Sequence, residues 1–188
     1  RPPPISTLFP YTTLFRSKIE GHLEISASSV PRKHLLPQLI DKFLRINPGV
    51  TFTVKDMDSK EVVDGILRGE IDFGFVGAQY EARNLIYIPV MDDELMMIVP
   101  LSMFPEYKDF DSVSIEKILN LPFIFREEGS GTLESLRLAM EQKGLSLGGF
   151  KTLAWIEDSE AIKKMVSIGT GCSFISVKDV GCKDDGIR

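Results

Sequence analysis

Three short segments of the 188-residue sequence carry hydroxyl groups or glycine at places where a polar ligand could bind. Each segment follows a predicted strand or precedes a predicted helix, and together they contain Ser28, Ser29, Ser59, Ser130, Gly131 and Thr132. Hydroxyl groups and the free N–H groups at a helix N-terminus bind anions and other polar molecules. The same residue types are also ordinary N-caps, which contribute about 0.5–2 kcal/mol to their own helix. Ligand binding and helix capping are therefore both open for each hydroxyl.

Two basic residues, Arg32 and Lys33, follow the first of these segments and are predicted in the first turn of a helix. Positive charge in that turn opposes the helix dipole and costs about a few tenths of a kcal/mol per residue. An anionic ligand or facing carboxylates would compensate for this cost. Screening of two solvated side chains is the simpler interpretation, and we favour it.

No group of residues predicts catalysis. Cys172 could act as a nucleophile, but no motif connects it to His22 or His34, and its apolar surroundings are typical of a core residue. The glycine pairs in 129–131 and 169–171 begin like a dinucleotide-binding loop, yet neither completes G-x-G-x-x-G. P-loop and HExxH motifs are also absent. We therefore expect that the chain is not an enzyme.

Metal and cofactor sites are not indicated either. Cys172 and Cys182 are ten positions apart and do not form a Cys-x-x-Cys motif. Glu127 and Glu128 beside Arg126 could be an acid/base pair, but adjacent carboxylates before a helix are more typical of a favourable helix N-terminus or of solvent exposure. We expect no catalytic residue, no metal and no cofactor.

The composition indicates an ordinary soluble globular chain. It is 43% hydrophobic and 26% charged, and 27 acidic residues against 22 basic ones give a formal net charge of −5. This balance argues against a duplex-binding surface within these residues. No apolar run approaches the roughly 20 residues needed to cross a bilayer, so we expect no membrane partner. The cysteine usage favours a reducing compartment and a cytoplasmic location.

Residues 1–17 differ in composition from the rest of the chain. They hold four of the eleven prolines, no acidic residue and the triplet Thr-Leu-Phe twice. The prolines would break the apolar helix that a secretory signal needs. We expect a disordered or artefactual arm over 1–17 and predict the fold from residues 18–188.

Strands and helices alternate after residue 18. Apolar residues alternate over 23–27 and recur with helical spacing over 35–44, and the pattern continues with a strand at 52–54, a helix over 62–67 and a strand over 71–76. Ser59 stands at the expected N-cap of the second helix. The third strand is apolar enough for burial on both faces. Repeated units of this length indicate a parallel sheet with right-handed crossovers.

A second unit of the same kind begins near residue 94. Its predicted strands cover 94–100, 122–125, 152–156 and 172–175, and its predicted helices cover 115–121, 133–140 and 161–166. Asp158 and Ser159 stand at the start of the last helix. Ligands of open parallel sheets bind beyond the carboxyl ends of the strands. If the two units face each other, the hydroxyl segments would meet in a shared cleft.

Several sequence runs resemble the effector-binding domain of LysR-type transcriptional regulators. They are LLPQLIDKFLRINP and LRGEIDFGFVG in the first unit and EEGSGT and GTGCSFIS in the second, within a resemblance that covers about residues 20–180. The resemblance implies an α/β fold of two Rossmann-like subdomains with a ligand cleft between them, similar to type II periplasmic binding proteins. It implies effector contacts from the hydroxyl segments named above and from the loop that contains Gly169 and Thr170.

The resemblance also implies a domain organisation. Residues 18–82 would form subdomain I, 83–91 a crossover, 92–180 subdomain II, and 181–188 a truncated tail or second crossover. The family's winged helix-turn-helix domain and the C-terminal return to subdomain I have no counterpart in the sequence, so the chain is expected to be a fragment. DNA would be contacted only through the missing domain.

The resemblance predicts a small anionic effector, and a homodimer or homotetramer whose arrangement the effector shifts. The sequence does not identify the effector. A free-standing solute-binding protein of a transport system is the alternative. It would share the cleft, but it would normally need an export signal, which residues 1–17 do not supply.

Overall fold

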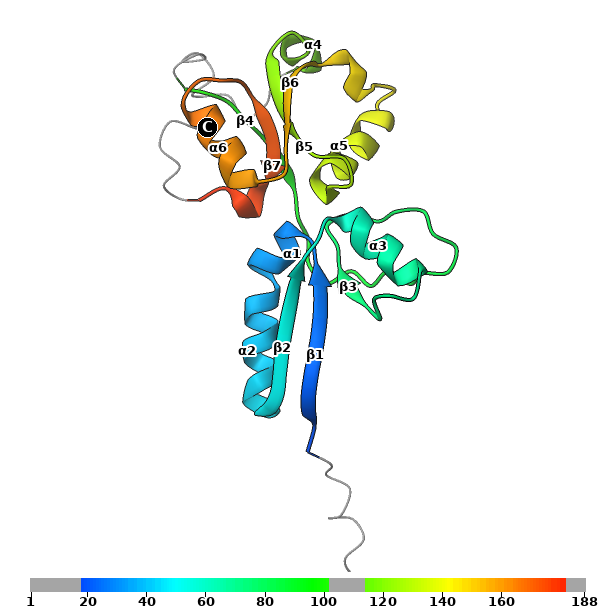
Figure 1. Ribbon diagram of the computed structural model, residues 1–188. Coiled ribbons are helices and arrows are strands. Elements are labelled where there is room, and N and C mark those ends of the chain that lie inside the picture. The colour runs from blue at the N-terminus through cyan, green and yellow to red at the C-terminus, as the bar shows by residue number, and fades with distance from the viewer. Residues whose placement is uncertain (1–17, 102–113, 182–188) are drawn as a thin grey trace, which may run out of the picture.

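The computed structural model describes residues 18–101 and 114–181, which form two lobes joined end to end (Figure 1). The first lobe comprises residues 18–77, and the second comprises 95–101 and 114–181. Residues 78–94 connect them. The arm predicted over 1–17 and nearly all of the tail predicted over 181–188 lie outside the described residues. Within the part described, no helix has both the length and the apolar character needed to span a membrane.

The first lobe is a parallel three-stranded sheet with helices. Its strands are β1 (Glu20–Ala27), β2 (Gly49–Asp56) and β3 (Gly74–Phe75), in the order β2-β1-β3. Its helices are α1 (Ser29–His34), α2 (Leu36–Ile46) and α3 (Ser59–Leu67). The buried carboxyl end of β1 and the first turn of α2 form a small core through Ile25, Ala27 and Leu36. The carboxyl ends of β1 and β2 point toward the second lobe (Figure 1).

The helix predicted over 35–44 is present as α2, and a short helix, α1, precedes it where a turn was predicted. The segment Ser28 to Pro31, predicted as a turn, starts α1, and the helical path breaks at Leu35 before α2 begins. Pro37 explains the break, because it has no N–H and its ring clashes with the carbonyl group four residues earlier in a continuous helix. As a result Arg32 and Lys33 lie in the last turn of α1, where the helix dipole favours cations. The predicted dipole cost is therefore wrong.

The third strand is shorter and more exposed than predicted. Only Gly74 and Phe75 pair with β1, and the Phe73 side chain is 46% exposed. No strand among the described residues covers the outer edge of β3. Burial of this strand on both faces, expected from its apolar sequence, is therefore wrong for the described part of the molecule.

The second lobe contains a mixed set of strands. They are β4 (Leu95–Ile98), β5 (Pro122–Arg126), β6 (Lys151–Ile156) and β7 (Ser173–Ser176). The helices are α4 (Ile115–Ile118), α5 (Gly131–Glu141) and α6 (Ser159–Ser167), with short 3-10 turns η2 (Leu147–Gly149) and η3 (Val177–Asp179). β5 and β6 pair in parallel, as predicted, but β4 and β7 pair antiparallel. The parallel prediction fails for β4 because this strand enters the lobe from the connecting segment instead of from a helix of its own unit.

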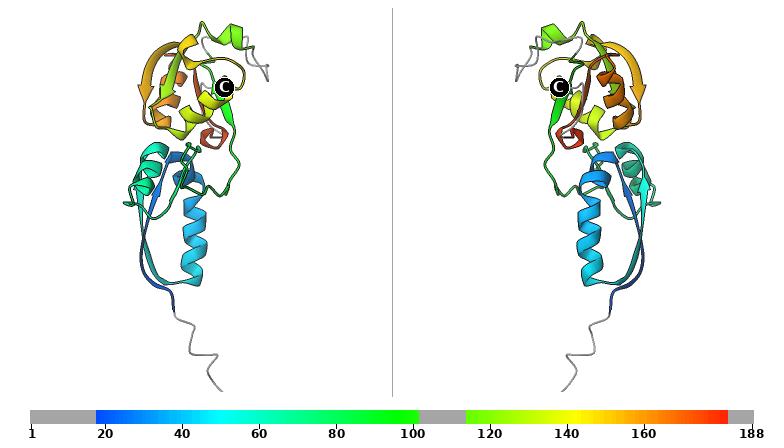
Figure 2. Two further views of the ribbon diagram at one scale, coloured as in Figure 1. Left: turned by 90° about the vertical axis from the view of Figure 1, so that its right-hand side faces the viewer. Right: turned by 90° about the vertical axis from the view of Figure 1, so that its left-hand side faces the viewer.

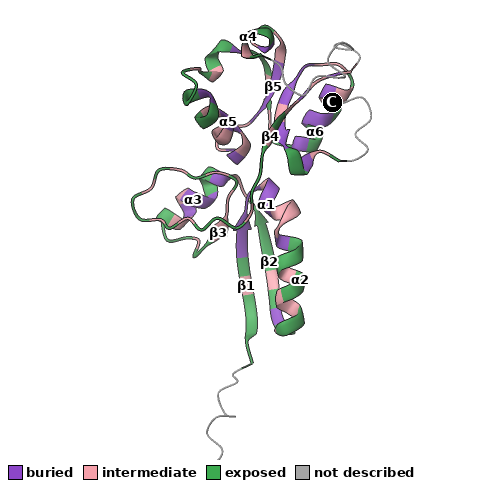
Figure 3. Ribbon diagram, turned by 180° about the vertical axis from the view of Figure 1, so that it is seen from behind, coloured by how far each residue is buried: buried purple, intermediate pink, exposed green. Residues whose placement is uncertain are grey.

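An aromatic cluster forms the core of the second lobe. Phe123 is fully buried, and its ring centroid lies 4.9 Å from that of Phe150 and 5.3 Å from that of Phe174. Cys172 belongs to the same cluster, and burial raises the pKa of its thiol to about 12. The prediction that Cys172 is a core residue is confirmed. Burial is concentrated in this lobe and at the cleft end of β1 (Figure 3).

The side views show α1 and α3 of the first lobe facing the second lobe (Figure 2). β5 and β6 are oriented so that their carboxyl ends face the first lobe, because Arg126 and the turn after Ile156 lie at the junction. Strand ends from both lobes therefore converge on one place.

Candidate functional site

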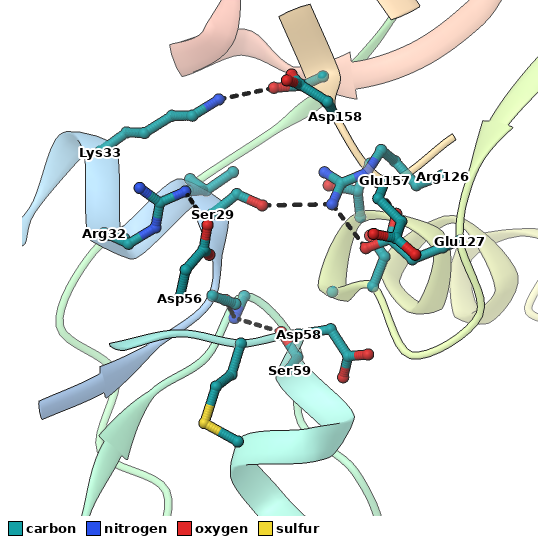
Figure 4. A pocket seen from close by; sticks show the side chains of 18 of the residues that line it. Ser29, Arg32, Lys33, Asp56, Asp58, Ser59, Arg126, Glu127, Glu157 and Asp158 are labelled. Carbon is teal, nitrogen blue, oxygen red and sulfur yellow. Dashed lines mark hydrogen bonds and ion pairs between the residues drawn. The ribbon is translucent and has the colours of Figure 1, made fainter. Parts of the chain in front are cut away.

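A cavity of about 580 Å³ lies between the two lobes. Its walls come from the carboxyl ends of β1, β2, β5 and β6 and from the helix N-termini that follow them (Figure 4). Six of the eight effector-contacting residues expected from sequence line it, namely Ser28, Ser29, Ser59, Ser130, Gly131 and Thr132.

Ser28 and Ser59 converge on one backbone group. The N–H of Gly77 donates to the Oγ of Ser28 at 3.0 Å and to the Oγ of Ser59 at 3.1 Å. Both serines are buried. A hydroxyl oxygen that accepts a hydrogen bond still has its own proton to donate. The two serines can therefore each donate a hydrogen bond to an acceptor atom in the cavity.

Ser59 is not the N-cap of α3. That position is taken by Asp58, whose Oδ1 accepts from the Glu61 N–H at 2.7 Å, while Glu61 Oε2 accepts from the Asp58 N–H at 3.1 Å. This reciprocal pair is a capping box. The expectation that Ser59 caps α3 is therefore wrong. Its hydroxyl faces the cavity and accepts a hydrogen bond from Gly77.

Ser130 is the N-cap of α5 by backbone position, but its hydroxyl caps nothing. The residue is 3% exposed, and no described group is hydrogen-bonded to its side chain. Gly131 and Thr132 follow in the first turn, where backbone N–H groups are not used within the helix. The N-terminus of α5 thus offers hydrogen-bond donors to the cavity.

The lobes are in close contact at Gly131. A Cβ atom on this residue would lie 2.7 Å from Ser59 Oγ and 2.9 Å from the backbone of Gly77. Only glycine fits such a contact without displacement. Nearby, the Lys60 N–H donates to the Gly129 carbonyl group at 3.1 Å, and the Tyr80 hydroxyl donates to the same carbonyl at 2.9 Å.

Arg126 is a site residue that the sequence did not reveal. It is 6% exposed and donates two hydrogen bonds to Glu127, from Nε to Oε2 and from Nη2 to Oε1, each 2.8 Å long. Nη2 also donates to Ser29 Oγ in the first lobe at 3.3 Å. The sequence suggested that Glu127 is solvated or stabilised by a helix N-terminus. It is instead held by Arg126. The one available signal was an arginine at the carboxyl end of a strongly apolar strand.

Arg32 and Lys33 both have polar partners at the cavity. Arg32 Nη2 lies 2.7 Å from Asp56 Oδ2, and Lys33 Nζ donates to Ser159 Oγ in the second lobe at 2.8 Å (Figure 4). The solvated interpretation favoured from sequence is wrong. Facing polar groups compensate both charges.

Lys33 also belongs to a group of contacts between the lobes, which we call the clasp: Lys33, His34, Ser159 and Asp179. His34 Nε2 lies 2.7 Å from Asp179 Oδ1, and Lys33 Nζ lies 3.9 Å from the same oxygen. The Asp179 side chain is only 3% exposed. The clasp therefore joins α1 of the first lobe to α6 and η3 of the second beside the cavity.

Asp179 makes the free energy of unfolding depend on pH in the acid range. Burial raises the pKa of this carboxyl, but the hydrogen bond from His34 and the charge of Lys33 outweigh burial and lower the pKa below its ordinary value. Such a group contributes stability above its unfolded pKa of about 3.9 and loses it as the pH falls through the folded value. We expect the loss of unfolding free energy caused by Asp179→Asn to be largest at neutral pH and to shrink below about pH 4.

Urea denaturation of both proteins over a pH series measures this difference. Asp41→Asn is the control, because Asp41 lies in an exposed pair with Arg45 and should show a small effect. A difference for Asp179→Asn that stays constant from neutral to acid pH would contradict the prediction.

Gly169 and Thr170 do not line the cavity. They follow α6 at its C-terminal end, and the next residues bring Cys172 N–H to the carbonyl group of Pro122, which starts β5. This is the end of the strand remote from Arg126. The expectation that the 169–171 loop lies near the pocket is corrected: in sequence it resembles the glycine-containing loop at 129–131, but it precedes a strand instead of a helix.

The charge of the cavity wall is strongly unbalanced. Nine carboxylate residues line it against three basic ones, Arg32, Lys33 and Arg126. The carboxylates are Asp56, Asp58, Glu61, Asp93, Glu127, Glu128, Glu157, Asp158 and Glu160. Despite this density, no group of three or more histidine, cysteine or acidic residues in the described ranges has the geometry to hold a metal ion.

Comparison with known proteins shows which family the chain belongs to. Residues 16–180 match the LysR substrate binding domain. The chain is 32% identical over 169 residues to the phosphonates import ATP-binding protein PhnC of Anaeromyxobacter dehalogenans, covering 89% of this chain and 32% of that protein. It is 31% identical over 159 residues to an uncharacterized HTH-type transcriptional regulator of Methanocaldococcus jannaschii, covering 84% and 52%. The chain thus spans between about a third and a half of these relatives.

A solved structure has the same fold. The Synechocystis CcmR regulatory domain in complex with 2-PG superposes with a TM-score of 0.73 at 21% sequence identity, over 90% of this chain and 79% of that one. The two-lobed α/β architecture expected from sequence is confirmed.

Proposed function

We propose, from the premise that this chain belongs to the LysR substrate binding domain family, that it is the ligand-sensing part of a transcriptional regulator. A small effector would bind in the cavity between the lobes. The observation that carries this proposal is the convergence of three hydroxyl segments and a buried arginine, from both lobes, on one cavity of about 580 Å³. That volume is typical of small-molecule sites.

The cavity is suited to sensing because an effector in it would touch both lobes. Ser28 and Ser59 come from the first lobe, and Ser130 and Thr132 come from the second. A ligand that contacts both is bound better when the lobes are close than when they are apart. Such differential affinity is the requirement for a ligand to shift a conformational equilibrium.

The effect on transcription would pass through parts of the regulator outside these residues. The M. jannaschii relative is described as an HTH-type regulator, and this chain matches about half of it. We propose that a helix-turn-helix domain contacts DNA and that pairing of subunits transmits the shift. Within this chain, residues 18–82 would act as subdomain I, 83–91 as a crossover and 92–180 as subdomain II.

An enzymatic role has little support. The family is a class of regulator domains, and the buried Cys172 thiol, with its raised pKa, is a poor nucleophile. The family match likewise gives no support to a free-standing transport protein.

The hydroxyls of Ser130 and Thr132, at the N-terminus of α5, provide the test. We expect Ser130→Ala and Thr132→Ala each to weaken effector binding by about 1–3 kcal/mol, the cost of leaving a buried partner unbonded. That corresponds to about 5- to 150-fold in Kd. A thermal-shift screen with small carboxylates, sulfate, phosphates, amino acids and 2-PG supplies the ligand, and calorimetry measures its Kd.

Thr53→Ala is the matched control, because Thr53 is exposed in β2 and does not line the cavity. It should leave the Kd unchanged. If both α5 variants unfold like the wild type and bind the ligand with the same Kd, the cavity is not the effector site.

A further inference from the structure

The basic residues of the cavity are already neutralised by the protein. Arg126 is paired with Glu127, and Arg32 is paired with Asp56. Lys33 is engaged by the clasp. An anionic ligand would therefore find no uncompensated positive side chain on the described wall, and it would meet a net excess of six carboxylates.

Several of the carboxylates have no such neutralisation. Glu157 and Asp158, in the turn between β6 and α6, have no ion pair with any described basic side chain. The same holds for Asp58 and Asp93, which are bonded to backbone N–H groups or to a serine hydroxyl. Figure 4 shows Asp158 on the upper wall of the cavity, Glu157 beside Arg126, and Ser59 on the lower wall next to Asp58. Glu157 and Asp158 thus lie apart from Ser59.

The Ser28, Ser59 and Ser130 hydroxyls can donate hydrogen bonds to an acceptor atom of a ligand. The Ser130 side chain is almost fully buried and has no protein partner among the described residues, although it faces the cavity. Ser28 and Ser59 accept from Gly77 and keep their protons to donate. A carboxylate oxygen is a strong acceptor for such donors, and the N-terminus of α5 favours a negative group.

We propose that the effector is zwitterionic: a small amino carboxylate whose carboxylate binds the Ser28, Ser59 and Ser130 hydroxyls and whose ammonium group faces Glu157 and Asp158. This proposal rests on the proposed function of the cavity and narrows the anionic effector expected from sequence to a class that also carries a cation. The ammonium group supplies the positive charge that Glu157 and Asp158 lack. A dianion of the same length would place its second negative charge against them.

The experiment compares ligands with the same number of carbon atoms whose far end is an ammonium group, a methyl group or a second carboxylate. Two series are used, ε-aminocaproate with caproate and adipate, and γ-aminobutyrate with butyrate and succinate. Calorimetric or NMR titration of the 1–188 chain gives the Kd of each. In at least one series we expect the amino carboxylate to bind about tenfold or more tightly than its monocarboxylate and dicarboxylate partners.

Removing the charges of Glu157 and Asp158 tests whether they cause the preference for the amino carboxylate. In the double variant Glu157→Gln/Asp158→Asn the advantage of the amino carboxylate should fall about tenfold, while the Kd of the monocarboxylate should not rise. Asparagine is as good an N-cap as aspartate, so α6 keeps its start. Glu81→Gln is the control, since Glu81 is exposed and does not line the cavity.

The outcomes separate the two proposals. Equal or tighter binding of the mono- or dicarboxylates, lost in Ser130→Ala, would overturn the zwitterionic effector and leave the cavity as the site. Amino carboxylate selectivity that survives in the double variant would overturn the role of Glu157 and Asp158. No binding of any compound, together with no effect of Ser130→Ala on any screened ligand, would overturn both proposals.

Discussion

Replacing Arg126 with methionine should lower the free energy of unfolding by about 3–5 kcal/mol, because it leaves the partly buried carboxylate of Glu127 without its partner. The Arg126 side chain is 6% exposed, and its guanidinium makes two hydrogen bonds to that carboxylate. Methionine has nearly the same length and is apolar, so the loss of packing is small. Urea denaturation followed by circular dichroism measures the change.

Three further variants identify the cause. Arg126→Lys keeps the charge but cannot reproduce the planar two-bond geometry, so it should be intermediate. Arg126→Met/Glu127→Gln removes the stranded charge and should recover part of the loss. Arg137→Met is the matched control, because Arg137 is 39% exposed in its pairs with Glu128 and Glu134 and should cost less than about 1 kcal/mol. If Arg126→Met cost no more than this control, the buried pair would not stabilise the lobe.

The alternation of strands and helices could be predicted because its signals are local. The periodicity of apolar residues and a capping aspartate such as Asp158 act within a few positions of each other. The paired strands β1, β2, β5 and β6 and the helices α3, α5 and α6 all appeared where these signals placed them. The break at Leu35 could also have been found, because Pro37 cannot lie inside a continuous helix.

The short β3 strand and the antiparallel β4–β7 pair could not be predicted in the same way. Phe73 is as apolar as a core residue, but its exposure depends on which strand covers the edge of the sheet. The direction of β4 depends on where the chain enters the second lobe. Both are properties of the tertiary arrangement, which a local pattern does not contain.

The candidate site could likewise be predicted only where its features are local in the sequence. The hydroxyl segments were found because turns after strands carry recognisable residue types. The contacts that join the lobes were not, because Arg126 and Ser29 are 97 positions apart, and His34 and Asp179 are 145 positions apart. Sequence alone gave no reason to pair them. The excess of carboxylates around the cavity could not be predicted either, because it arises only when several turns, far apart in the sequence, come together.

Gly131→Ala should weaken effector binding by about 5- to 150-fold without loss of folding stability. The added Cβ would lie 2.7 Å from Ser59 Oγ and 2.9 Å from the Gly77 backbone, both in the first lobe. Backbone atoms cannot rotate away, so the lobes must separate slightly, and overpacking of this kind costs about 1–3 kcal/mol. Alanine is no worse a helix former than glycine, and Gly131 is the first residue of α5, so the second lobe itself should melt no earlier.

The separation of the lobes can be measured without any effector. The Lys60 N–H donates across the junction to the Gly129 carbonyl group, so hydrogen exchange at Lys60 should become faster in Gly131→Ala. Gly148→Ala is the control, since a Cβ there would meet only Ser146 Oγ at 3.8 Å, an ordinary contact far from the cavity wall. Unchanged Lys60 exchange and unchanged Kd in Gly131→Ala would show that binding does not require the close approach of the lobes. Faster exchange with weaker binding would link the affinity for the effector directly to the distance between them, as a sensor of this design requires.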